Sequence, residues 1–438
     1  MKRYLVLFHF GPVQEFIQTA RRTDDYWAGS FMLSHTTAEV IKRLKTGTGG
    51  TEIIFPNPEG NPLAEAVMNG GPIEGDALQP SLLNRVSALV NAESAESLKK
   101  TLEGIRESVL DELAGRFSRS EKALTDAPAR FAEAQVRDLF EFFFAFKEYD
   151  GLRHGESLRK VEEAMAARKN IRSFSQGLQK GHKCTQCGVR EPLRQDEGDQ
   201  FVLDRLRKYW SGLARRKFKY TFKINERLCG VCAGKRLLRK VHYDGAGIPS
   251  TSTISIAHWL DTQLLPAVST SDASRFLDLL EAAGLNTRAA RVPHNSANRS
   301  RFFDIDGDCF IPDSYDRFEK DAQEEEDGKG AKVTEAADFL KSRILKGCPS
   351  PPKYFTILAL DGDSMGKYFR SLTRLEEHQK AGLALSRFTA QVYTMIRERY
   401  HGYVIYFGGD EGVILLPLAE TILILPDFVF LIHVNKCE

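Results

Sequence analysis

The sequence has little surplus of either charge and no long apolar run. Its 438 residues carry 61 Lys and Arg against 59 Asp and Glu, a formal net charge of +2. The chain as a whole is therefore not a strongly basic nucleic-acid binder, and charge must be read locally. No stretch is long and apolar enough to span a bilayer, and the N-terminal residues lack a signal-peptide pattern. These absences predict a globular cytoplasmic protein without a membrane partner.

Cysteine is also scarce, but its spacing is informative. Of the seven cysteines, four form two C-x-x-C pairs: Cys184, Cys187, Cys229 and Cys232. In a long chain without a secretion signal, such pairs indicate a metal site rather than disulfides. Four thiolates leave no open position on a tetrahedral ion, so we predict a structural Zn²⁺ site. The alternative is that these are buried free thiols.

Two segments of the chain share one pattern. Residues 3–10 and 353–360 are apolar, strand-like runs, and each is followed by a glycine turn and a helical pattern. Residues 94–176 and 256–290 have helical periodicity, and the charged stretch 321–332 predicts a surface loop or linker. An internal duplication of a strand–turn–helix unit is therefore expected.

The second copy carries acidic residues at both of its turns. Asp361 and Asp363 follow the strand at 353–360, and Asp410 and Glu411 follow two glycines in a predicted hairpin. A helix is expected between them, at about 374–399. In a ferredoxin-like palm the first strand lies beside such a hairpin, so the two acid pairs converge. Carboxylate and phosphate oxygens are the ligands that Mg²⁺ prefers, which predicts a magnesium site.

The residues after Asp361 suit a phosphate. A helix that starts after Asp363 would direct backbone N–H groups towards a triphosphate, and Lys367 adds a cation. Glycines at a tight turn permit close approach of a ligand. The predicted nucleotide-binding residues of this half are Asp363, Ser364, Met365, Gly366, Lys367, Gly408 and Gly409. The alternative is a capped helix and an ordinary hairpin turn.

These patterns predict an α+β fold with two ferredoxin-like palm domains, helical insertions and a four-cysteine zinc site; the resemblance described next implies that both palms are of the cyclase and polymerase type. Residues 1–250 would form a first, degenerate palm with a helical insertion and the zinc segment. Residues 251–350 would form a helical region and charged linker. Residues 351–438 would form the second palm, with the DGD and GGDE motifs.

Five stretches in this order resemble the large subunit of type III-B (Cmr-type) CRISPR effector complexes. They are "FGPVQEFIQTARRTDDYWAGSFMLS", "AARKNIRSFSQ…HKCTQCGVRE", "IPSTSTISIA", "LALDGDSMGKYF" and "YFGGDEGVILLPL". The resemblance implies an RNA-guided antiviral complex whose palms make cyclic oligoadenylate from ATP when target RNA binds. It implies that Asp361, Asp410 and Glu411 hold Mg²⁺ or Mn²⁺. It also implies that the first palm completes an ATP cleft through Gly11, Pro12, Val13 and Gln14. The implied partners are ATP, the other subunits, crRNA and target RNA.

Three features depart from that family. Many members carry an HD nuclease domain, but none of the ten histidines here is followed by Asp, so we predict no HD nuclease. The second acid of the signature is usually Asp and is here Glu411. After about residue 418 the likeness ends, and residues 419–438 are expected to form strand rather than the second palm helix. This pattern suggests a second palm that is truncated at its C-terminus and loosely packed.

Two other functions stay open at this point. One is a structural subunit of the complex whose palm is catalytically impaired. The other is a GGDEF-like nucleotide cyclase that acts alone on GTP, which the zinc segment and the apparent second palm disfavour.

Overall fold

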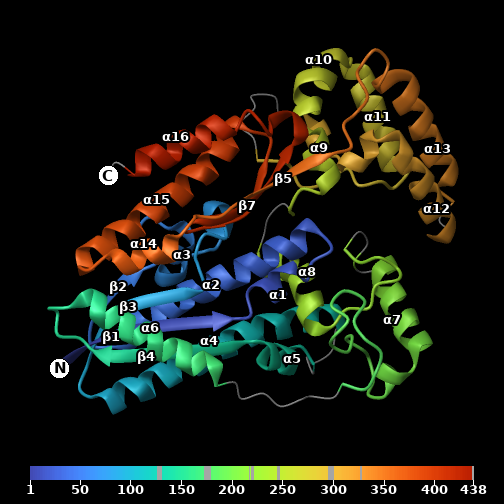
Figure 1. Cartoon of the computed structure of the whole chain (residues 1–438). Helices are drawn as coiled ribbons and strands as arrows, with labels where there is room; N and C mark the ends of the chain where they lie inside the picture. The colour runs from blue at the N-terminus through green and yellow to red at the C-terminus, as the bar shows by residue number, and fades with distance from the viewer. Residues whose placement is uncertain are drawn as a thin grey trace.

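A computed structural model of the chain describes residues 1–125, 131–171, 179–216, 218, 221–243, 247–293, 300–325 and 328–436. Figure 1 shows two sheets, each with its own helices, and a helical part beside the second sheet. The fold therefore mixes helices and sheets, as predicted. None of the helices in the described residues is both long and apolar enough to cross a membrane.

Four antiparallel strands form the first sheet, in the spatial order β2-β3-β1-β4: β1 (Lys2–Gly11), β2 (Thr51–Phe55), β3 (Arg85–Ala92) and β4 (Glu141–Glu148). Apart from α3 (Pro62–Asn69), which lies in the connection between β2 and β3, the chain order of strands and helical connections is β-α-β-β-α-β. The central strand β1 is the apolar run predicted at residues 3–10. It is buried on both faces, which is why its sequence shows no alternation.

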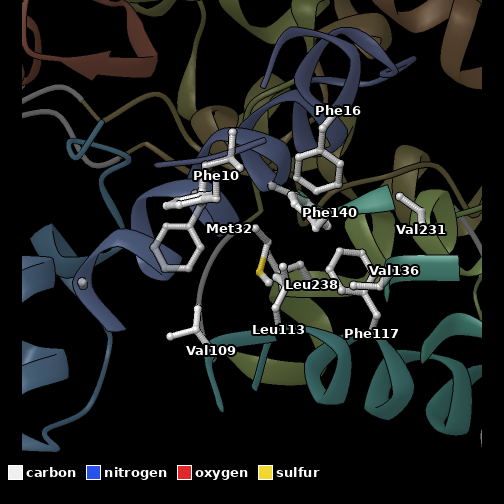
Figure 2. Packing of buried hydrophobic residues seen from close by; sticks show 14 of the residues in the cluster. Phe10, Phe16, Met32, Val109, Leu113, Phe117, Val136, Phe140, Val231 and Leu238 are labelled. Atoms are coloured by element: carbon white, nitrogen blue, oxygen red, sulfur yellow. The ribbon is translucent and has the colours of Figure 1, made fainter. Parts of the chain in front are cut away.

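Each face of the first sheet has its own helical cover. On one face α2 (Thr23–Gly47) and α4 (Ala95–Thr125) pack over Tyr4, Val6 and Phe8. On the other, α6 (His154–Asn170) packs over Leu5 and Leu7. The larger cluster continues into α1 (Gln14–Gln18), α5 (Ala132–Leu139) and α8 (Gly230–His242). Figure 2 shows its centre, where side chains from β1, α4, α5 and α8 converge.

The helical expectation for residues 94–176 is wrong at Glu141–Glu148, which form β4 beside β1. The stretch contains four phenylalanines, and aromatic residues favour a pleated, half-buried surface over a helix. The ring of Phe10 stacks on that of Phe142 with centroids 5.2 Å apart, and Tyr4 meets Phe146 edge-on at 6.0 Å. Such cross-strand aromatic pairs stabilise a sheet.

The second sheet has the spatial order β5-β7-β6: β5 (Phe355–Leu360), β6 (Tyr403–Gly408) and β7 (Glu411–Pro417). After β5 come α14 (Met365–Ser371) and α15 (Leu375–Arg399), and after β7 comes α16 (Leu425–Lys436). The predicted helix at 374–399 is confirmed by α15, and the prediction that β5 lies beside the hairpin is confirmed by its pairing with β7.

The expectation that residues 419–438 form strand is wrong for Leu425–Lys436, which form α16. Pro426 lies in the first turn of this helix, where a missing N–H costs nothing. Ile424 and Phe428 are buried in one cluster with Val392 and Ile396 of α15. The second sheet therefore has a second helix packed beside α15, although Ile357 of β5 and Val429 and Phe430 of α16 are exposed.

The part of the chain that lies between the two sheets in the sequence is helical and has its own apolar cluster. Its α-helices are α9 (Thr251–Trp259), α10 (Leu265–Ala267), α11 (Thr270–Ala282), α12 (Tyr315–Glu325) and α13 (Gly330–Phe339). The predicted surface linker at 321–332 is wrong for most of its length, because α12 and α13 extend into it. Residues 326 and 327 of that stretch lie outside the described residues. α7 (Leu203–Arg216) is not part of this helical region. In the sequence it lies between the two cysteine pairs.

Candidate metal and nucleotide site

The two acidic turns of the second sheet meet. β5 pairs with β7 in the register Leu360↔Gly412, so Asp361 lies next to the two-residue turn Gly409–Asp410. The contact is close: a Cβ added at Gly362 would lie 2.7 Å from the Cβ of Asp410. A glycine between the two aspartates therefore allows the loop after β5 to lie against the hairpin turn.

The carboxylates in this region disfavour one another's charge. Burial and the nearby charge of Asp361 raise the pKa of Asp410 above its usual range. Burial also raises the pKa of Glu411, with added repulsion from Asp410 and Asp361, while a hydrogen bond from Tyr406 opposes the shift. The Tyr406 hydroxyl donates to Oε1 of Glu411 at 3.2 Å. A group of repelling carboxylates suits a hard dication, which would neutralise them.

The carboxylates of Asp361, Asp410 and Glu411 are neighbours, but their oxygen atoms are not close enough together to hold one ion. In the part of the chain that the structure describes, the groups whose ligand atoms all lie within 4.8 Å are the four cysteines and His258 with His401 and Glu420. Asp361 and Glu411 are exposed, and Asp410 is half-buried. A dication that bridges Asp361, Asp410 and Glu411 would have to draw these side chains inward.

The predicted phosphate loop is exposed and contains a strained residue. Ser364 has φ 61° and ψ 20°, in the left-handed region that costs a non-glycine residue about 1–3 kcal/mol. It precedes α14, and its carbonyl accepts the backbone N–H of Lys367 at 2.8 Å. Asp363, Gly366 and Lys367 are exposed, and Met365 is partly buried. The loop is thus open to a ligand, and the amide of Lys367 is already used.

The two glycines of the GGDE turn pack against the first half of the chain. A Cβ at Gly408 would lie 3.2 Å from the backbone of Ser81, and one at Gly409 would lie 2.6 Å from Leu83. Gly409 also has φ 66°, as the first residue of a two-residue hairpin turn often does. Their lack of a side chain therefore serves the turn and this packing, whatever ligand binds nearby.

The segment Pro80–Leu83 thus braces the acidic hairpin, and sequence reasoning missed it. The carbonyl of Pro80 accepts the backbone N–H of Phe407 at 3.2 Å and the hydroxyl of Tyr393 at 2.8 Å. No local pattern marks these residues, because their partners lie more than 300 positions away. The stretch Gly11, Pro12, Val13 and Gln14 runs from the last residue of β1 to the first residue of α1, and its role in nucleotide binding stays a prediction.

The four paired cysteines come together as predicted. Their sulfur atoms all lie within 4.8 Å of one another, and Sγ of Cys187 lies 3.8 Å from Sγ of Cys229. Backbone N–H groups point at two of the sulfurs: Gln186 N–H at Cys184 and Cys232 N–H at Cys229, at 3.4 and 3.5 Å. Four converging sulfurs with N–H donors fit a tetrahedral Zn²⁺, which would be held by all four thiolates.

A buried ion network ties this cluster to the core. The guanidinium of Arg236 donates to Oδ2 of Asp25 at 2.7 Å, to Oε2 of Glu226 at 3.1 Å and to Oε1 of Gln186 at 2.9 Å. Gln186 lies inside the first C-x-x-C pair, and Asp25 lies on α2. The side chains of Arg236 and Asp25 are at most 1% exposed. The four-cysteine segment is thus part of the core of the first half of the chain.

Two family profiles match the chain. One, described as "Cas10/Cmr2, second palm domain", matches residues 354–429, and one described as "CRISPR-associated protein Cmr2, N-terminal" matches residues 5–117. The class is therefore that of the palm-containing CRISPR proteins. The two matched segments are those of the Cmr2/Cas10 proteins of CRISPR systems.

The relatives agree with these matches at low identity. The chain is 22% identical to "CRISPR system Cmr subunit Cmr2" of Pyrococcus furiosus, over 94% of this chain and 53% of that protein. Similar solved structures are a type III-B Cmr-beta apo state, with a TM-score of 0.58, and a Cmr-beta bound to cognate target RNA, with a TM-score of 0.59. Both are 14% identical to this chain. Each match covers 98% of this chain, and they cover 60% and 62% of the two matched chains, respectively. It thus spans between half and two thirds of the relatives it matches.

Proposed function

We propose that this chain is the nucleotide-polymerising subunit of an RNA-guided type III-B complex, and that it converts ATP to cyclic oligoadenylate when target RNA binds. The observation that carries the proposal is the contact of the DGD loop with the GGDE turn at Gly362 and Asp410. The β-α-β-β-α-β order and antiparallel β2-β3-β1-β4 sheet of the first half support a ferredoxin-like palm there. The order β5, α15, β6, β7, α16 supports a second one.

The residues of the second sheet would perform separate tasks. Asp361 and Asp410, with Glu411, would hold Mg²⁺ or Mn²⁺. Such an ion, when bound, would polarise a ribose 3′-hydroxyl and neutralise the pyrophosphate that leaves as the 3′-oxygen bonds to the α-phosphorus. The exposed loop from Asp363 to Lys367 would receive the triphosphate, with the Lys367 ammonium as its cation. Tyr406 orients Glu411 through its hydrogen bond.

Partners of the complex follow from the same proposal. One matched structure is of a type III-B Cmr-beta bound to cognate target RNA, and the proposal extends that partner, with crRNA and the other subunits, to this chain. An impaired structural subunit is the second candidate. Glu411 favours it, because Glu reaches one methylene further than the aspartate usual at that position.

The test uses the assembled complex, labelled ATP, Mn²⁺ or Mg²⁺, and target RNA. We expect oligoadenylate from the wild type and a loss of at least about 100-fold in Asp410→Asn, since a metal ligand is removed. Glu398→Gln, which removes an exposed carboxylate on α15, is the matched control and should keep full activity. Equal turnover in Asp410→Asn would refute the metal role of Asp410. No product from an intact wild-type complex would favour the structural subunit.

A further inference from the structure

A cluster of two histidines and two carboxylates joins the helical part to the second sheet. His258 lies in α9, Asp261 in the π-helical turn η3 (Leu260–Leu264), His401 before β6 and Glu420 in η8 (Leu418–Glu420). Because β6 has six residues, about 20 Å separates this cluster from the GGDE turn at the other end of the strand. The cluster is therefore distinct from the palm site and from the four cysteines.

Three atoms of this cluster that could bind a metal ion lie close together. Nδ1 of His401 lies 2.6 Å, and Nδ1 of His258 3.0 Å, from the same Oε1 of Glu420. All three ligand atoms lie within 4.8 Å of one another. The other carboxylate oxygen, Oε2, accepts the backbone N–H of His401 at 2.8 Å, which directs Oε1 towards the two rings.

The fourth side chain holds the far side of one ring. Nε2 of His401 lies 3.1 Å from Oδ2 of Asp261. When Nε2 carries the proton and donates it to this carboxylate, the lone pair of Nδ1 faces Oε1 of Glu420. Histidines that bind metal ions usually donate their other ring N–H to a carboxylate or carbonyl in this way. Asp261 thus presents Nδ1 of His401 as a ligand atom.

We propose that His258, His401 and Glu420 bind a transition-metal dication such as Zn²⁺, and that Asp261 is the positioning residue of this site. Two imidazoles and one carboxylate are a common ligand set for such ions. Three protein ligands leave one coordination position for water or a partner group. The side chain of Glu420 is 4% exposed and that of His258 is 29% exposed, so the ion would enter past His258.

The consequence is a metal link between two parts of the fold. α9 packs against β7 and contacts β5, and the ion would add bonds from α9 to the residues that precede β6 and follow β7. It would hold the helical part against the second sheet at the end away from Asp410. This role is independent of the proposed nucleotide chemistry, and so is its test.

The experiment titrates the purified full chain, its four-cysteine site loaded with Zn²⁺, with Co²⁺ and in parallel with Zn²⁺, in excess Mg²⁺ that occupies the proposed site at Asp361, Asp410 and Glu411. We expect one further equivalent to bind, with visible cobalt d–d bands but without the intense near-ultraviolet band that thiolate ligands give. His258→Ala should lose this equivalent, with affinity reduced at least about 100-fold, while the four-cysteine site keeps its zinc and reports that the chain is folded. His433→Ala, which removes an exposed histidine of α16, is the matched control.

Asp261→Asn separates positioning from ligation, because it leaves all three ligands in place. We expect its affinity to fall about 10–100-fold, with the stoichiometry unchanged and a shifted cobalt spectrum. A wild type that takes up no further equivalent overturns the proposal, and so does equal uptake by His258→Ala. Either result would mean that hydrogen bonds among these side chains, without a metal ion, hold the cluster together.

Discussion

Gly362→Ala should disable the proposed nucleotide site while leaving the fold in place. The added methyl group would lie 2.7 Å from the Cβ of Asp410, whereas carbon atoms prefer about 3.5–4.0 Å. It would also lie 2.7 Å from Cγ of Met365, so the loop after β5 and the turn that carries Asp410 must separate by about 1 Å. A displacement of that size in a catalytic group costs about 100-fold in rate. The overpacking itself should lower the free energy of unfolding by about 1–3 kcal/mol.

Gly104→Ala makes the same chemical change at an exposed position of α4. A Cβ there would have nothing within 4 Å. Alanine in a helix is favoured over glycine by about 0.5–1 kcal/mol, so this variant should be neutral or slightly stabilised.

The assay is oligoadenylate formation from labelled ATP in the assembled complex with target RNA, and Mn²⁺ binding by electron paramagnetic resonance is a second readout. We expect both to fall in Gly362→Ala and to stay unchanged in Gly104→Ala. Equal rates and equal Mn²⁺ binding in the two variants would refute the reasoning, because the two acidic turns would then not need their close contact. If Gly362→Ala loses Mn²⁺ binding but the wild-type complex makes no oligoadenylate, the metal site is supported and the proposed cyclase activity is refuted.

Three further predictions concern stability. Cys187→Ser should lower zinc content below one ion per chain and destabilise the first half, because the site's binding energy, on the order of 10 kcal/mol, is also folding energy. Arg236→Met should cost about 3–5 kcal/mol in urea unfolding, since it leaves the buried carboxylates of Asp25 and Glu226 without their cation. Burial, with Lys169 and Arg85 nearby, lowers the pKa of His9 from 6.5 to about 4. Stability should therefore fall as the pH drops from about 6.5 towards 4, where the unfolded chain binds a proton that the folded chain does not, and His9→Gln should remove up to about 3 kcal/mol of that loss.

Each of these has a control in the same chain. Cys348→Ser removes a thiol outside the four-cysteine cluster and should leave the zinc content unchanged. Arg205→Met breaks an ion pair whose arginine side chain is 70% exposed and should cost less than about 1 kcal/mol. For His9, the measurement is the difference in urea midpoint between pH 7.5 and pH 5. An identical pH dependence in His9→Gln would mean that other groups cause the acid loss.

Local sequence patterns predicted the elements that local physics determines. The strand at 3–10 and the helix at 374–399 were confirmed nearly to the residue, because apolar runs and helical periodicity mark them directly. Glu141–Glu148 and Leu425–Lys436 were assigned wrongly, and in both cases tertiary packing decided. β4 is fixed by its aromatic pairs with β1, and α16 by the burial of Phe428 beside α15.

The candidate site divides in the same way. The spacing of Asp361, Asp410 and the four cysteines could be read from the sequence, because each motif is local and only two motifs must meet. The brace at Pro80–Leu83 could not be read, since backbone carbonyls and a leucine side chain have no signature. The cluster of His258 with His401 and Glu420 was missed for a similar reason, because its members lie far apart in sequence and none belongs to a motif.

The connections between the middle strands of the two sheets explain how the halves of the chain differ. In the second sheet β6 and β7 are joined by two residues, Gly409 and Asp410, so the acid is held at the tip of a tight turn. In the first sheet the equivalent connection, from β2 to β3, runs over residues 56–84, and its last part packs on that same turn. A two-residue turn has few contacts of its own to resist displacement. The carbonyl of Pro80 and the side chain of Leu83 supply that resistance from outside, so the first half supports the site by bracing Asp410 and needs no acids of its own at the end of β1.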